Sequence, residues 1–250
     1  MRHLDLFSGI GGFALAARWV GWETVGFCEI DPYCQQVLRK HWPDVPIYDD
    51  VRELKGETVG HVDIITGGFP CQDISVANIN AEGIVGKRSG LWSELHRLIG
   101  ELRPRIALME NVTALLGRGL DVVLGDLAQI GYDTEWHCIP ASAIGAPHQR
   151  DRTWIIAYPN CQGVEGPRAT PRIVKTGPWG WCGKRDFQEL CEAPFERRDM
   201  RWPQPVLCRV DDGLFARVDR LRAIGNAIVP QVAEVIFRAI DAAQTVREQK

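Results

Sequence analysis

The segment His3-Leu4-Asp5-Leu6-Phe7-Ser8-Gly9-Ile10-Gly11-Gly12-Phe13 decides the fold, because a cluster of glycines joins an apolar run to a helical pattern. His3 to Phe7 has the composition of a buried strand, and Phe13 to Val20 carries apolar residues at helical spacing. Glycines at a strand-to-helix turn let the backbone approach a ligand closely. We therefore expect a strand, a ligand-binding turn and a helix at the start of an α/β domain.

Short apolar runs and helical patterns alternate as far as residue 157, which is typical of a parallel sheet covered by helices. The predicted strands are His3–Phe7, Thr24–Cys28, Val62–Thr66, Ile106–Met109, Trp136–Pro140 and Thr153–Ala157. The predicted helices are Phe13–Val20, Pro32–His41 with Asp31 as N-cap, Trp92–Leu102, Leu120–Ile130 ending at Gly131, and Pro230–Val246. The sequence thus predicts an α/β fold with a doubly wound, mostly parallel sheet.

The region from residue 158 to 210 differs in texture from the rest of the chain. Proline, glycine, tryptophan and charged residues are mixed there without a long period, which suggests a loop-rich insert. It holds nine basic and six acidic residues, so its net charge is +3 although the whole chain carries −3. We therefore divide the chain into a main domain, 1–157 with 211–250, and an insert, 158–210, which is either a loop-rich recognition region or partly disordered. Charge alone favours a solvated surface over nucleic-acid binding.

Cysteine usage and the termini give the expected compartment. The eight cysteines are scattered singly without a CxxC pair, so we expect reduced thiols. We see no cleavage site and no apolar run of the length needed to cross a bilayer, and therefore expect a cytoplasmic protein. We also expect no metal site: four cysteines of the insert could bind zinc in principle, but they lack paired spacing. They are Cys161, Cys182, Cys191 and Cys208.

Glu29 ends the second predicted strand, twenty residues after Gly9. A glycine turn with a carboxylate at the next strand's tip suits an adenosine, whose ribose hydroxyls the carboxylate can bind. The signal is weak by itself because Gly9-Ile10-Gly11-Gly12 departs from GxGxxG, and a dehydrogenase would share it.

Three further features follow or precede predicted strands. Cys71 comes just beyond Asp63 to Gly68, where α/β proteins keep their active sites, and Pro70 restrains its backbone. Glu110 follows the strand Ile106–Met109, so its acid is expected in the same crevice. Arg150 and Arg152 lie at i and i+2, hence on one face if extended. By contrast, we interpret three other cysteines as inert small hydrophobes: Cys28, Cys34 and Cys138.

Taken together, these motifs resemble the DNA cytosine-5 methyltransferase family, in particular its compact phage and bacterial members. The resemblance spans residues 5 to 240 and rests on the order of the motifs as well as on their residue types. They are Asp5 to Phe13, Glu29-Ile30-Asp31, Asp50-Val51, Gly68-Phe69-Pro70-Cys71-Gln72 with Ser75, Glu110-Asn111-Val112, Gln149-Arg150-Asp151-Arg152 and Gly225 to Pro230.

The resemblance implies a Rossmann-like domain dependent on S-adenosylmethionine and a chemistry that these residues suit. Cys71 would add to carbon 6 of a flipped-out cytosine and thereby make carbon 5 nucleophilic. Glu110 would hold or donate a proton at ring N3, with its pKa raised by burial. Arg152 would bind the O2 oxygen, and Arg150 a DNA phosphate or the closed loop.

The resemblance also assigns the cofactor pocket. Phe7 would lie near the adenine, Glu29 would hold the ribose, Ile30 would pack on the adenine, and Asp50 would accept from its amino group. Asn226 would return from the C-terminal segment to line the pocket. The remaining pocket residues would be Gly9, Gly11, Gly12 and Pro70.

The expected partner is double-stranded DNA, bound by a monomer that acts alone or beside a cognate restriction endonuclease. One departure concerns residues 211–222, where the family's arginine- and glutamate-rich helix motif is replaced by another sequence. The nearest rival is a transfer RNA cytosine-5 methyltransferase, and a non-catalytic DNA-binding pseudoenzyme is a second. The complete set of Cys71, Glu110 and Arg152 speaks against a pseudoenzyme, and nothing supplies a dehydrogenase's hydride-transfer partner.

Overall fold

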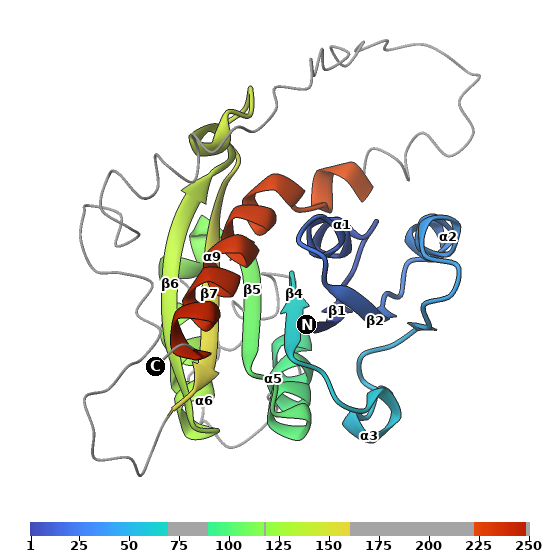
Figure 1. Ribbon diagram of the computed structural model, residues 1–250, viewed down its shortest axis with the longest axis horizontal. Coiled ribbons are helices and arrows are strands. Elements are labelled where there is room, and N and C mark those ends of the chain that lie inside the picture. Colours follow the sequence, from blue (N-terminus) through green and yellow to red (C-terminus); the bar gives the residue numbers. More distant parts are fainter. Residues whose placement is uncertain (70–89, 118, 161–222, 249–250) are drawn as a thin grey trace, which may run out of the picture.

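The computed structural model describes residues 1–69, 90–117, 119–160 and 223–248, with side chains as far as residue 244. These residues form one seven-stranded sheet in the order β3-β2-β1-β4-β5-β7-β6 (Figure 1). The strands are β1 (Arg2–Leu6), β2 (Glu23–Cys28), β3 (Ile47–Tyr48), β4 (Ile64–Gly67), β5 (Ile106–Val112), β6 (Tyr132–Pro140) and β7 (Asp151–Pro159).

The first five strands along the chain run parallel, whereas β7 lies antiparallel between β5 and β6. After β1 the chain moves outward through β2 to β3, then returns to place β4 on the other side of β1. The strand order therefore reverses between β1 and β4. Open α/β sheets bind ligands outside the carboxyl ends of the strands at such a switch point.

Helices cover both faces of the sheet because the parallel strands alternate apolar side chains between the two faces. On one face lie α1 (Gly12–Trp19) and α9 (Pro230–Glu248), which pack against each other, with α2 (Pro32–His41) beside α1 (Figure 1). The other face is covered by α3 (Gly56–Val59), α5 (Leu91–Leu102) and α6 (Leu120–Gln129). On β4, Ile64 is buried in the core beneath α1 and α9, whereas the next residue, Ile65, is buried in the core beneath α5 and α6.

Local signals account for several helix ends. The Asp31 carboxylate accepts hydrogen bonds from the amides of Tyr33 and Cys34, which confirms its role as the N-cap of α2. Gly131, with φ of 79°, follows the last turn of α6 in a left-handed conformation that glycine adopts without cost. The helix α5 ends before Pro104, as its sequence predicts.

The predicted doubly wound, mostly parallel α/β fold is confirmed, with differences of detail. Sequence periodicity misses β3 and α3, since segments of two and four residues are too short to show a period. The strand β5 extends to Val112 because β7 pairs with it from Ala107 to Val112. Most of the proposed recognition region, 158–210, lies outside the described residues.

The C-terminal helix corrects the expectation that no apolar run could cross a bilayer. Among the described residues, the stretch 223–244, which contains most of α9, is long and apolar enough to do so. Its apolar side chains have another partner, however: Val232, Ile236 and Phe237 are buried in the core on the α1 face. The composition of this helix is therefore explained by packing inside the protein.

We expect Ile236→Ala to lower the free energy of unfolding by about 2 to 5 kcal/mol, because Ile236 is fully buried between α9 and the sheet. Ile224→Ala is the matched control, since Ile224 is 64% exposed, and should change stability by less than about 0.5 kcal/mol. Urea denaturation of both variants measures the difference. Equal effects of the two substitutions would show that α9 does not pack as described.

Candidate active site

The turn after β1 is a tight loop in which glycines serve two different purposes. Gly9 has φ of 53°, and a Cβ atom there would meet nothing within 4 Å, so the loop faces open space at this point. Gly11 has φ of 84°, and a Cβ there would lie 2.8 Å from the Trp42 ring. Gly9 therefore leaves room for a ligand, whereas Gly11 lets α2 pack closely against the turn.

Glu29 joins the turn after β1 to the turn after β2. Its Oε2 accepts a hydrogen bond from the Gly9 amide at 2.7 Å, and its Oε1 accepts one from the Asp31 amide at 2.8 Å. A carboxylate has about four lone-pair sites, so acceptor capacity remains on both oxygens. Glu29 can therefore hold the loop and accept from a ligand's hydroxyl groups at the same time.

An exposed apolar residue directly follows Glu29 in the chain. Ile30 is 65% exposed, the largest exposed fraction among the described large hydrophobic residues. Phe7, on the other turn, has φ of 54°, an uncommon conformation for a bulky residue that is often kept for function. Isolated exposed apolar residues are normal, but here one stands next to a carboxylate and an open glycine turn.

Asp50 carries a second carboxylate of the candidate site, and Arg52 binds it. Both Asp50 oxygens accept from the Arg52 guanidinium at 2.6 to 3.0 Å, and Oδ1 also accepts from the Arg52 amide. The side-chain hydrogen bonds from Arg52 lower the pKa of Asp50. Asp50 is therefore a charged acceptor, although in part already engaged.

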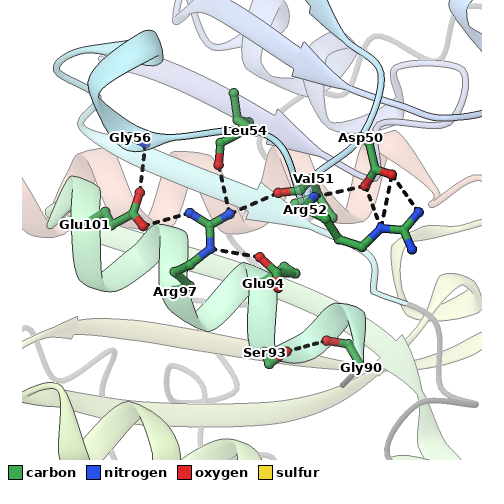
Figure 2. A network of polar contacts seen from close by, with 10 residues as sticks. All are labelled: Asp50, Val51, Arg52, Leu54, Gly56, Gly90, Ser93, Glu94, Arg97 and Glu101. Atoms are coloured by element: carbon green, nitrogen blue, oxygen red, sulfur yellow. Dashed lines mark hydrogen bonds and ion pairs between the residues drawn. The ribbon is translucent and has the colours of Figure 1, made fainter. Parts of the chain in front are cut away.

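Arg97 on α5 secures the segment that carries Asp50 (Figure 2). Its Nη2 donates to the carbonyl oxygens of Val51 at 3.0 Å and Leu54 at 2.8 Å. Glu94 and Glu101 accept from its other nitrogens at 2.8 and 2.7 Å. The sequence gives little signal for this role, because Glu94, Arg97 and Glu101 have the spacing of an ordinary exposed helix face.

Beyond the end of β4, an amide side chain anchors the backbone. Asn111 donates from Nδ2 to the Phe69 carbonyl at 2.9 Å, and both residues are buried. Gly68 lies close to Glu110, since a Cβ at Gly68 would be 3.4 Å from Glu110 Oε2. The chain is thus held beside Glu110 one residue before Pro70, while Pro70 and Cys71 lie outside the described residues.

Glu110 lies within β5, not beyond its end as predicted, because the strand continues to Val112. Its carboxylate is 8% exposed, and Oε1 forms an ion pair with Arg152 Nε at 2.9 Å. Burial raises the pKa of Glu110, and the charges of Arg152 and Arg150 oppose that rise. Burial therefore favours the protonated form of Glu110, and the two nearby arginines reduce that preference.

Arg150 does not have the extended backbone that would place it on one face with Arg152. It precedes β7 with φ of 40°, in the left-handed region. Its Nη2 donates to the Gly225 carbonyl at 2.9 Å and also to the Ala227 carbonyl. Burial lowers the pKa of Arg150, and the neighbouring charge of Arg152 acts in the same direction.

The segment that Arg150 contacts returns to the glycine turn. Asn226 is exposed, while Ile228 is 9% exposed and packs in the core with Phe13. A Cβ at Gly12 would lie 2.6 Å from Ile228 Cγ1, so only glycine permits this approach without a shift. The structure thus brings the C-terminal segment to the expected end of the sheet.

A buried polar network below the turns was not predicted. His3 lies within hydrogen-bonding distance of Thr24 Oγ1, at 3.1 Å, and of Thr66 Oγ1, at 2.7 Å. Thr66 in turn donates to Asp5 Oδ1 at 3.0 Å. Burial lowers the pKa of His3 to about 3 and raises that of Asp5. The alternation of His3 and Asp5 with buried leucines was the available signal.

The three expected inert cysteines are consistent with that interpretation. Cys28 and Cys34 are buried, Cys138 is partly buried, and all three are free thiols. Burial raises the pKa of Cys28 to about 12, with the Glu29 charge adding to the effect, which suppresses the reactive thiolate. Within the described residues no group of three or more possible ligands could hold a metal ion, and the four cysteines of the insert lie outside them.

Comparison with known proteins gives matches over most of the chain. Residues 1–178 match the family model of C-5 cytosine-specific DNA methylases. The type II methyltransferase M2.BsuMI of Bacillus subtilis is 38% identical over 165 residues, which are 63% of this chain and 42% of that protein. M.CviJI, a type II methyltransferase of Paramecium bursaria Chlorella virus IL3A, is 36% identical over 241 residues, 96% of this chain and 59% of that protein.

A solved structure of a Spodoptera frugiperda DNMT2 variant aligns with a TM-score of 0.55, covering 67% of this chain and 52% of that one. At 22% identity this likeness shows a shared fold alone. The chain spans about half the length of the curated relatives it matches.

We expect Glu110→Gln to gain stability relative to the wild type as the pH rises. Burial raises the pKa of Glu110 in the folded state, so its contribution to stability is complete below the unfolded pKa of about 4.3 and is lost as the pH passes through the folded pKa. Glutamine does not titrate. Urea unfolding of both proteins from about pH 4 to pH 8 measures the difference.

Glu23→Gln, at an exposed site on β2, serves as the control and should follow the wild type at every pH. If the wild type instead gains stability over Glu110→Gln with rising pH, the ion pair with Arg152 outweighs burial and the direction of the pKa shift is wrong.

Proposed function

Because this chain belongs to the family of C-5 cytosine-specific DNA methylases, we propose that it transfers a methyl group from S-adenosylmethionine to carbon 5 of a cytosine flipped out of duplex DNA. The observation that carries the proposal is the buried Glu110–Arg152 pair beside the backbone that leads into Pro70 and Cys71. The open glycine turn with Glu29 lies at the same ends of the parallel strands.

We propose Cys71 as the nucleophile. Carbon 5 of cytosine is a poor nucleophile until a thiolate adds to carbon 6 and makes the ring an enamine. Cys71 lies outside the described residues, but the Asn111 amide fixes the carbonyl of Phe69 two residues earlier. That anchor supports delivery of the thiol to the side of the sheet edge where Glu110 lies.

Glu110 and Arg152 would bind the base. Addition of the thiolate places negative charge on the ring, and a carboxyl group at ring N3 can offset it by sharing a proton. The raised pKa of the buried Glu110 supports this role. Arg152 has guanidinium nitrogens beyond the Nε that pairs with Glu110, and these would donate to the O2 oxygen. Arg152 would thus hold both the base and the carboxyl group.

The residues around the glycine turn after β1 fit S-adenosylmethionine, which when bound supplies an electrophilic methyl group. The remaining lone pairs of Glu29 would accept from the ribose hydroxyls, and the exposed Ile30 would pack on the adenine. Phe7 would lie at the adenine's other side, and Asp50 would accept from its amino group. The open space at Gly9 supports the fit, since a ligand can approach the backbone there. Gly11, Gly12, Pro70 and Asn226 would complete the pocket.

We further propose residues 158–210 as the region that selects the target sequence, because the chemical groups all lie elsewhere and the segment carries a net positive charge. The DNA partner, a cytoplasmic location and a monomeric state remain part of this proposal. Two of the related proteins are type II methyltransferases, which supports a cognate restriction endonuclease as a further partner.

Glu29→Gln and Glu29→Ala should weaken S-adenosylmethionine binding, the alanine variant by about 2 to 4 kcal/mol if both charge-assisted hydrogen bonds are lost. Glu23→Ala, on the exposed start of β2, is the control. Calorimetry with folded proteins measures the affinities, and DNA binding should persist. Unaltered cofactor affinity in folded Glu29→Ala would remove Glu29 from the pocket.

A duplex with 5-fluorocytosine at the target should become covalently bonded to the protein when S-adenosylmethionine is present. Release after methyl transfer requires loss of the substituent at carbon 5 as a cation, which a proton can do and fluorine cannot. The adduct should withstand denaturants and be visible by electrophoresis. Cys71→Ala should form none yet still bind DNA, since flipping and phosphate contacts do not need the thiol.

Cys138→Ala is the matched control and should form the adduct as the wild type does, because Cys138 is a partly buried thiol on β6 that the proposed mechanism does not use. Transfer RNA offered in place of DNA separates the nearest rival activity. A wild type that methylates DNA without forming the adduct, or a Cys71→Ala protein that forms it, would identify another nucleophile or another reaction.

A further inference from the structure

Arg150 has a backbone conformation that few residues of its kind adopt. Its φ of 40° lies in the left-handed region, which is unfavourable in free energy for any residue that has a Cβ atom. Such conformations persist where the surrounding structure requires them, and they gather at functional sites. The strained backbone therefore indicates that contacts of Arg150 with the rest of the protein hold it in this conformation.

The guanidinium group of Arg150 binds both sides of one short turn. Its Nη2 donates to the carbonyl oxygens of Gly225 and Ala227, which flank Asn226. A terminal guanidinium nitrogen carries two hydrogens, so both are used by the two carbonyls. Its Nε is buried and has no hydrogen-bond partner among the described residues. Most of the donors of Arg150 therefore face the protein.

The turn that Arg150 holds lies against the proposed cofactor end. Ile228 is buried with Phe13, and its side chain occupies the space that a Cβ at Gly12 would need. Asn226 itself is exposed, so it is available to a ligand. The turn thus has a core contact on one side and Arg150 on the other.

We infer that Arg150 is a positioning residue that holds the Gly225–Ala227 turn, and with it Asn226, against the cofactor pocket. The inference rests on the proposed function. It differs from the role expected from sequence, in which Arg150 binds a DNA phosphate or the closed loop. Arg152, two residues along, pairs with Glu110 at the base site, so the two arginines serve different ligands.

Hydrogen exchange and cofactor binding in the absence of DNA test this role. Arg150→Ala should speed amide exchange at residues 225–230 and weaken S-adenosylmethionine binding about tenfold, the loss typical of a charged hydrogen bond. Arg150→Lys should fall between, since an ammonium keeps donors for the carbonyls. The double variant Arg150→Ala/Asn226→Ala should bind no more weakly than the weaker single variant, because both act through one turn.

Arg152→Ala is the matched control. It should abolish methylation yet leave exchange at 225–230 unchanged and cofactor affinity within about twofold, because Arg152 pairs with Glu110 and not with the carbonyls of the turn. A phosphate role for Arg150 would appear instead as a salt dependence of DNA binding reduced by about one phosphate contact.

Cofactor affinity unchanged in Arg150→Ala, or additive effects in the double variant, would overturn the inference while the proposed function stands. A wild type that binds no S-adenosylmethionine would remove the proposed function, and unchanged exchange at 225–230 in Arg150→Ala would independently show that Arg150 does not hold the turn.

Discussion

Parallel pairing of β1 with β4, with Leu6 opposite Gly67, brings two turns of different purpose to one edge of the sheet. Below them, the Thr66 hydroxyl on β4 donates to Asp5 on β1, so it accepts from Nε2 of His3, which is also on β1. With its proton on Nε2, His3 accepts from the Thr24 hydroxyl through Nδ1. A slip of one residue would reverse the faces and leave these buried groups without partners. The network therefore fixes the register on which the site depends.

The buried ionisable groups of this network favour their uncharged forms. Burial lowers the pKa of His3 to about 3 and raises that of Asp5, so both groups favour their neutral forms. Neutral groups avoid the large cost of an unpaired buried charge. The ionisable groups of the candidate site lie elsewhere: Glu29 and Asp50 are beside the glycine turn, and the Glu110–Arg152 ion pair is at the proposed base site.

Backbone carbonyls serve as the attachment points of the site. Arg97 binds those of Val51 and Leu54, Asn111 that of Phe69, and Arg150 those on either side of Asn226. Each of these side chains holds a turn that carries a functional group but does not itself need to touch a substrate. Turns are the most mobile parts of a fold, and donors fixed on helices and strands restrain them.

The sequence by itself determined the α/β class, the order of the longer strands and helices, and the chemical groups that follow the predicted strands, because apolar periodicity and motif order are properties of the chain. It could not show that Glu110 lies within a strand, since β5 is lengthened by pairing with β7, whose partner residues are 40 to 50 positions away in sequence. Only the tertiary structure placed Ile228 against Gly12 and turned Arg150 towards Gly225 and Ala227. Those contacts join distant segments, and no local pattern encodes which distant carbonyl a side chain will reach.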